Sequence, residues 1–175
     1  MNIKMMSKIM FVLMFSFVFC YSSIAITPGP QPNQTGDLAV IIAASDTTEY
    51  INDWITTSHE TPVIIKRIKE TKQGATVYIA FLITGFSSDD NNNYNFIVNF
   101  MLYGPDGEII FNEKNYAKSL GKTPKNPTFI MADPALDLIL EDSDPVGVYK
   151  LEAEVIDLIV NKNAKNIYFL ELIKE

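Results

Sequence analysis

The stretch GVYKLEAEVID, residues 147–157, alternates apolar and polar side chains with a period of two. Its apolar positions are Tyr149, Leu151, Ala153 and Val155, and its charged positions are Lys150, Glu152 and Glu154. Successive side chains of a β-strand point to opposite faces of the sheet, so this pattern predicts a strand with one buried and one solvated face. Such strands are typical of antiparallel sheets.

Strand patterns continue on both sides of this segment. The tetrapeptide GPDG at 104–107 is a tight turn, because proline fixes φ and glycine accepts a positive φ. Short strands separated by turn signals, without alternating helices, favour an all-β, antiparallel β-sandwich. The predicted strands are 38–44, 63–69, 75–86, 94–103, 108–111, 128–131, 135–140, 147–157 and 166–173, with a polar connection at 112–126.

The residues that lead into 147–157 carry a more specific signal. Asp144-Pro145-Val146-Gly147-Val148-Tyr149 resembles the D-x-G-x-Y start of strand F in immunoglobulin-like domains, with Leu151 at the position of the cysteine. The resemblance covers about 62–173 and is to bacterial secreted immunoglobulin-like domains. It implies an immunoglobulin-like sandwich in which the Tyr149 hydroxyl bonds to upstream backbone. It carries no catalytic residue.

A short N-terminal helix is expected at 47–57. Its apolar residues Tyr50, Ile51, Trp54 and Ile55 share one helical face. The strands at 94–103 and 166–173 are apolar on both faces, although a sandwich strand needs only one buried face. We therefore expect this helix, or a partner chain, to cover an outer face, and we expect Trp54 to be buried there.

The N-terminus has the pattern of an export signal. Two lysines precede an apolar run at 9–19, and Ser23-Ile24-Ala25 offers the small residues of a cleavage site. We expect a signal peptide at 1–25 cleaved near Ala25, a Pro/Gly-rich leader at 26–36, and one β-sandwich domain at 37–175. The protein would be periplasmic or secreted, and no later segment has the length of a membrane span.

Charge and composition disfavour several functions. The 175-residue chain carries a net charge of −7, and removal of residues 1–25 would make it −9, which repels nucleic acid and anionic membranes. The one cysteine lies within the predicted signal peptide, and His59 is the one histidine. Thiolate and multi-histidine metal sites are therefore excluded within one mature chain.

The loop at 87–93 could hold a hard cation. Its oxygen-bearing side chains Asp89, Asp90, Asn91 and Asn93 are ligands of the type that Ca²⁺ prefers. The alternative is a solvated turn, since Asn and Asp suit turn conformations. No other cofactor is expected.

Acidic residues gather at 133–157, and lysines at 62–72 and 112–126. The first interpretation is an acidic partner surface that includes Asp142, Asp144, Glu152 and Glu154. The second is internal neutralisation by the lysine-rich segments.

Three functions follow from these observations. The first is an exported, non-catalytic binding or accessory module that engages a protein or glycan through loops or an edge strand. The second is a hydrolase with a carboxylate or His59 site. The third is a structural component that self-associates as a homo-oligomer through an exposed apolar strand face.

Overall fold

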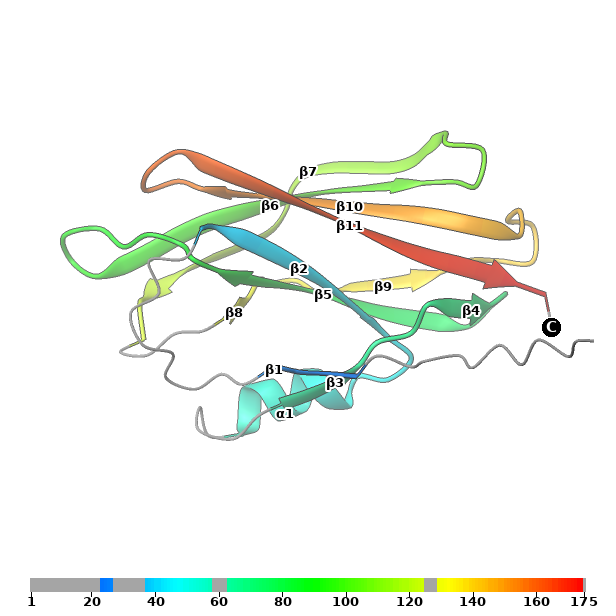
Figure 1. Ribbon diagram of the computed structural model, residues 1–175, viewed down its shortest axis with the longest axis horizontal. Helices are drawn as coiled ribbons and strands as arrows, with labels where there is room; N and C mark the ends of the chain where they lie inside the picture. Colours follow the sequence, from blue (N-terminus) through cyan, green and yellow to red (C-terminus); the bar gives the residue numbers. More distant parts are fainter. Residues whose placement is uncertain (1–22, 27–36, 58–62, 125–128, 175) are drawn as a thin grey trace, which may run out of the picture.

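Two β-sheets face each other in the computed structural model, which describes residues 23–26, 37–57, 63–124 and 129–174 (Figure 1). The larger sheet has the strand order β4 (Glu70–Lys72), β11 (Lys162–Ile173), β10 (Gly147–Asp157), β6 (Asn93–Tyr103) and β7 (Ile109–Lys122). The smaller sheet contains β2 (Ala39–Ser45), β5 (Thr76–Thr84), β8 (Ile130–Met131) and β9 (Leu136–Ile139). All neighbouring strands are antiparallel except β4 and β11.

This arrangement confirms the predicted all-β, immunoglobulin-like sandwich. Strand β10 lies between β6 and β11 as strand F lies between C and G in that fold. The core fills the space between the sheets, and Phe81 of β5 meets Phe100 of β6 with ring centroids 5.5 Å apart. Each fully buried side chain of this size contributes roughly 1.5–3 kcal/mol.

Tyr149 connects the turn before β10 to the core. Its ring is fully buried, and its hydroxyl donates to the carbonyl of Pro145 over 2.8 Å. Burial raises the pKa of this hydroxyl, with the charge of Asp144 adding to the effect. Gly147 has a φ of +139°, and a Cβ there would lie 2.9 Å from a side-chain carbon of Pro105. Only glycine suits that position without strain.

Helix α1 (Glu49–Thr56) and strand β3 (Val63–Lys66) cover the outer face of the smaller sheet (Figure 1). Tyr50 is the buried side chain of the helix, and its hydroxyl donates to the carbonyl of Tyr78 over 3.3 Å. Trp54 is half-buried against the same cluster, and Ile55 is 74% exposed. The prediction of a buried Trp54 therefore needs correction, because the one-turn-earlier Tyr50 takes the buried position.

Three sequence expectations about elements were wrong. Residues 112–122 belong to β7 and not to a polar connection. The prediction missed them because the first seven residues of β7 are exposed and show no alternation of apolar and polar side chains. The helix begins at Glu49, two residues later than expected, and its N-cap Thr48 makes no side-chain capping bond. Strand β4 and the first residues of β11 were not predicted.

The helix covers the smaller sheet, although the strands with two apolar faces, β6 and β11, belong to the larger sheet. It follows β2 directly and stays on the sheet that contains β2. Among the described residues, no helix or strand lies over the outer face of the larger sheet (Figure 1).

Candidate functional site

The outer face of the larger sheet presents ordered rows of side chains across its strands. The register places Tyr103 of β6, Lys150 of β10 and Phe169 of β11 in one row, with Ile109 of β7 beside Tyr103. The next row holds Met101, Glu152 and Ile167. Side chains that are directly opposite on one face interact, so each row acts as a unit.

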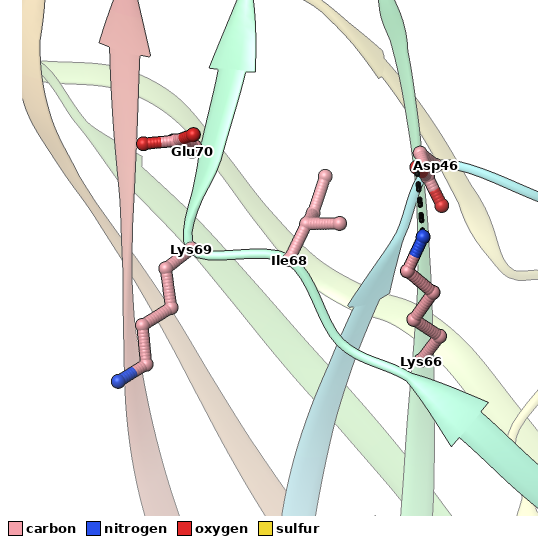
Figure 2. A pocket seen from close by; sticks show the side chains of 5 residues that line it. All are labelled: Asp46, Lys66, Ile68, Lys69 and Glu70. Atoms are coloured by element: carbon pink, nitrogen blue, oxygen red, sulfur yellow. Dashed lines mark ion pairs between the residues drawn. The ribbon is translucent and has the colours of Figure 1, made fainter. Parts of the chain in front are cut away.

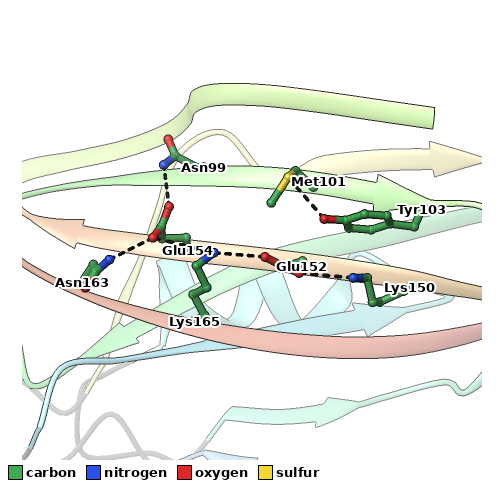
Figure 3. Close-up of polar contacts among 8 residues, drawn as sticks. All are labelled: Asn99, Met101, Tyr103, Lys150, Glu152, Glu154, Asn163 and Lys165. Carbon is green, nitrogen blue, oxygen red and sulfur yellow. Dashed lines mark hydrogen bonds and ion pairs between the residues drawn. The ribbon is translucent and has the colours of Figure 1, made fainter. Parts of the chain in front are cut away.

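A chain of polar contacts runs along the middle of this face (Figure 3). Lys150 and Lys165 both contact the Glu152 carboxylate, at 3.4 and 3.3 Å, and Lys165 lies 4.0 Å from Glu154. The side-chain amides of Asn99 and Asn163 each donate to Glu154, over 3.1 and 3.0 Å. The carboxylates of β10 are thus already paired within the molecule.

These contacts shift the pKa values of the groups involved. The amide of Asn99 is the main cause of the lowered pKa of Glu154, and Asn163 and Lys165 add to it. The hydrogen bond to Glu152 is the main cause of the raised pKa of Lys165, with the charge of Glu154 adding to it. Glu154 is therefore held ionised, which does not suit the role of a general acid.

Three exposed apolar side chains lie on this face toward the start of β10, each opposite a charged residue of the neighbouring strand: Val148 opposite Glu171, Phe169 opposite Lys150 and Ile167 opposite Glu152. Val148 is 50% exposed, Ile167 is 48% exposed and Phe169 is 59% exposed. The Lys150 ammonium lies 3.5 Å from the centroid of the Tyr103 ring, which places a cation over one aromatic face. We call Val148, Ile167 and Phe169 the apolar end of the outer face.

Strand β7 adds a free edge beside this end. Lys118 exchanges backbone hydrogen bonds with Asp133, so the second half of the β7 edge is bridged at this residue. The first half, 109–115, has no strand partner on that side among the described residues, and it begins with the exposed Ile109, Ile110 and Phe111. Unpaired edges with apolar side chains are templates for pairing with another chain.

A small cleft of about 320 Å³ lies where β3 leads into β4 (Figure 2). Asp46 and Lys66 form an exposed ion pair across it at 3.9 Å. The remaining lining residues are Ile68, Lys69 and Glu70. Its charges balance and its walls are exposed, so it offers little to orient a small molecule.

The predicted calcium loop forms a tight turn between β5 and β6. The Asp89 carboxylate accepts the backbone N–H groups of Asn91 and Asn93, at 2.9 and 2.7 Å, and the Asn93 side-chain amide at 2.9 Å. These hydrogen bonds, chiefly those from Asn93, lower the pKa of Asp89. This geometry is that of an Asx turn, and a calcium ion there stays a prediction.

The predicted acidic surface divides into two places. Asp144 caps the turn between β9 and β10, where its carboxylate accepts the N–H of Glu141 over 2.7 Å. Asp142 lies in the same turn, and its carbonyl accepts from the Gln73 side chain over 3.1 Å. Glu152 and Glu154 lie farther along β10 on the outer face and pair with lysines. These four acids do not form one continuous patch.

Several other expectations lie outside what the structure describes. His59, most of the predicted signal peptide and the leader after Ile26 belong to the residues that are not described. In the described ranges, no three His, Cys, Asp or Glu side chains come together as a metal site. No helix in those ranges is long and apolar enough to cross a bilayer.

Sequence reasoning missed two buried polar contacts. Asp157 is 1% exposed, and its carboxylate accepts the N–H groups of Ser87 and Ile159 at 2.7 and 2.9 Å. Arg67 lies 4.5 Å from the centroid of the Tyr168 ring, and the Tyr168 hydroxyl donates to the Ile68 carbonyl. The polar last position of the otherwise alternating 147–157 strand was the one available sign of the first contact.

Comparison with known proteins identifies no family and finds distant structural matches. No protein-family model and no curated protein matches the sequence. A family 123 glycoside hydrolase from Clostridium perfringens, described for glycolipid glycan hydrolysis, matches 80% of this chain and 28% of its own length, with 12% identity and a TM-score of 0.46. The CARDB domain of a Pyrococcus furiosus protein, solved with di-metal ions, matches 82% of this chain and 99% of its own, with 10% identity and a TM-score of 0.42.

Proposed function

We propose that the protein is an exported, non-catalytic binding or accessory module that engages a protein partner through the outer face of its larger sheet. The exposed apolar end formed by Val148, Ile167 and Phe169 carries the proposal. Exposed apolar side chains that lie together on one surface favour protein association. The immunoglobulin-like sandwich supplies the rigid frame on which such a surface is displayed.

The composition of the face favours a protein over a glycan. Aliphatic groups make up much of its exposed apolar surface, and Lys150 covers one face of the Tyr103 ring. Phe169, which is 59% exposed, offers one open aromatic ring, but a sugar would also need unpaired polar groups for its hydroxyls. The carboxylates of Glu152 and Glu154 already have partners within the molecule. We therefore expect these charged residues to form a polar rim that orients the bound protein.

The same pairing argues for binding and against the hydrolase alternative. The carboxylates of Glu152 and Glu154 lie on an open sheet face and are paired with cations or amides. General-acid catalysis needs a carboxyl whose pKa is raised by an apolar pocket, and the pKa of Glu154 is lowered.

The test is capture of a partner from the native cell envelope by three purified chains. The wild-type chain is compared with Phe169→Lys, which places a charge in the apolar end, and with Leu158→Lys as the matched control. Leu158 is 46% exposed and lies in the turn beyond the far end of β10. Both substitutions should leave the melting temperature nearly unchanged, because both side chains are exposed.

We expect one protein to be captured by the wild type and by Leu158→Lys, and its yield to fall about tenfold or more with Phe169→Lys, as an interface centre predicts. Equal capture by all three chains would contradict the proposed surface. A polysaccharide as the captured species would replace the protein partner with a glycan.

A further inference from the structure

Strand β1 (Ser23–Ile26) pairs with the full length of β3. The antiparallel register runs from Ser23 opposite Lys66 to Ile26 opposite Val63. The two strands form a separate two-stranded sheet beside α1 (Figure 1), and β3 pairs with no other described strand. The N-terminal segment therefore supplies the ladder partner of β3.

The predicted cleavage after Ala25 would remove three of the four residues of β1. The leader that would follow, ITPGPQPNQTG at 26–36, has prolines at positions 28, 30 and 32. Proline has no backbone N–H and cannot donate to a ladder. The alternate prolines remove every donor along one edge of an extended leader, which makes it a poorer ladder partner than β1, and the β3 edge would lose its β1 partner on export.

The side chains of β3 also pack against elements other than β1. Val63 is 2% exposed and Ile65 is fully buried, and both pack in the cluster that joins α1 to the smaller sheet. Ile64 and Lys66 point outward, with Ile64 64% exposed. Two buried aliphatic side chains would keep the edge ordered, so its free N–H and C=O groups would stay aligned for a new strand.

We propose that export opens the β3 edge as a docking site for an extended strand of a partner protein, which takes the antiparallel place of β1. The proposal depends on the export proposed above and uses a different surface from the outer face of the larger sheet. The occupant is defined by what the edge already accepts, an extended and proline-free Ser-Ile-Ala-Ile segment. Main-chain bonds to a sheet edge are a known mode of peptide recognition.

Amide hydrogen exchange of β3 tests the proposal on two chains. One is the exported chain isolated from the producing cell, and the other is a chain that begins at Ser22 and keeps β1. The probe is the synthetic peptide YSSIAIT, residues 21–27. The control peptide carries Ile24→Pro and Ala25→Pro, which remove two adjacent donors, one of which faces β3 in any antiparallel ladder.

We expect β3 amides that bond to β1 to exchange about tenfold or more faster in the exported chain, since edge amides are open to water. The YSSIAIT peptide should restore their protection and the control peptide should not. Equal protection of β3 in both chains, or no effect of the peptide, would overturn the proposal. An exported chain whose mass still includes residues before Ile26 would also overturn it, and would leave the outer-face proposal to be judged separately by capture.

Discussion

At each end of β10 one side chain forms hydrogen bonds to the backbone of an adjoining loop or turn, and the two side chains differ in chemistry. Tyr149 uses a neutral hydroxyl on the Pro145 carbonyl at the first end. Asp157 uses a buried carboxylate on the backbone of Ser87 and Ile159 at the second. The strand between them is positioned by these contacts as well as by its ladder.

Tyr149→Phe should destabilise the protein while the fold is kept. The ring stays buried, and the Pro145 carbonyl loses its donor, which costs about 0.5–1.5 kcal/mol. Urea unfolding measures the change. Tyr78→Phe is the matched control, because its hydroxyl has no hydrogen-bond partner among the described residues. An equal loss in both variants would contradict the corner role of Tyr149.

Asp157→Ala should lower the free energy of unfolding more than the replacement of an acid in an exposed turn. It leaves two backbone N–H groups without their charged acceptor in a buried place, for a loss of about 2–4 kcal/mol. Asp106→Ala is the control, since Asp106 also accepts a backbone N–H, over 3.0 Å, in an exposed turn. A loss below about 0.5 kcal/mol for Asp157→Ala would show that water replaces the carboxylate.

Asp89 should make the free energy of unfolding depend on pH in the acidic range. Its pKa is lower in the folded protein than in the unfolded chain, so its contribution is present above the unfolded pKa and is lost as the pH falls through the folded pKa. The difference in unfolding free energy between the wild type and Asp89→Asn should shrink from pH 6 towards pH 2. A difference that is constant over that interval would contradict the carboxylate cap.

The same loop also decides between a turn and a calcium site. Both Asp89 oxygens accept hydrogen bonds from amide groups, so a calcium ion would have to displace them. We expect millimolar calcium to leave the melting temperature unchanged. A clear rise would show binding to the folded state and would favour the calcium interpretation over the turn.

At the scale of elements, the alternation of apolar and polar side chains predicted strands that have one buried and one solvated face. Strand β10 has the bounds expected for it, because every second side chain along it is buried in the core. The same period separated the two faces of β6 and β11, but it did not show which face is inward because both are apolar. Of β7, residues 109–111 were predicted as strand and the rest was not, because its first seven residues are all exposed and show no alternation.

The place of the helix shows where sequence reasoning ends. The sequence indicated an apolar helical face and an apolar sheet face, and both exist. Which sheet the helix covers depends on connectivity and on the packing of Tyr50 against the backbone of β5. The outer face at Ile167 and Phe169 therefore stays open, which no local pattern could establish.

At the scale of the whole molecule, the sandwich separates its two outer surfaces by role. The outer face of the smaller sheet is covered by α1 and β3, and the outer face of the larger sheet displays an apolar end beside a paired charged stripe. The acids on β10 pair with Lys150 and Lys165, which lie outside the lysine-rich segments 62–72 and 112–126. No described helix or strand covers the outer face of the larger sheet.

The central claim is that this apolar end contacts a protein partner in the native envelope. A photo-crosslinking amino acid in place of Phe169, in the exported chain and in the producing cell, measures that contact directly. The account predicts one discrete crosslinked protein from position 169 and none from the same group in place of Leu158. No crosslink from position 169, or the same product from both positions, would contradict it.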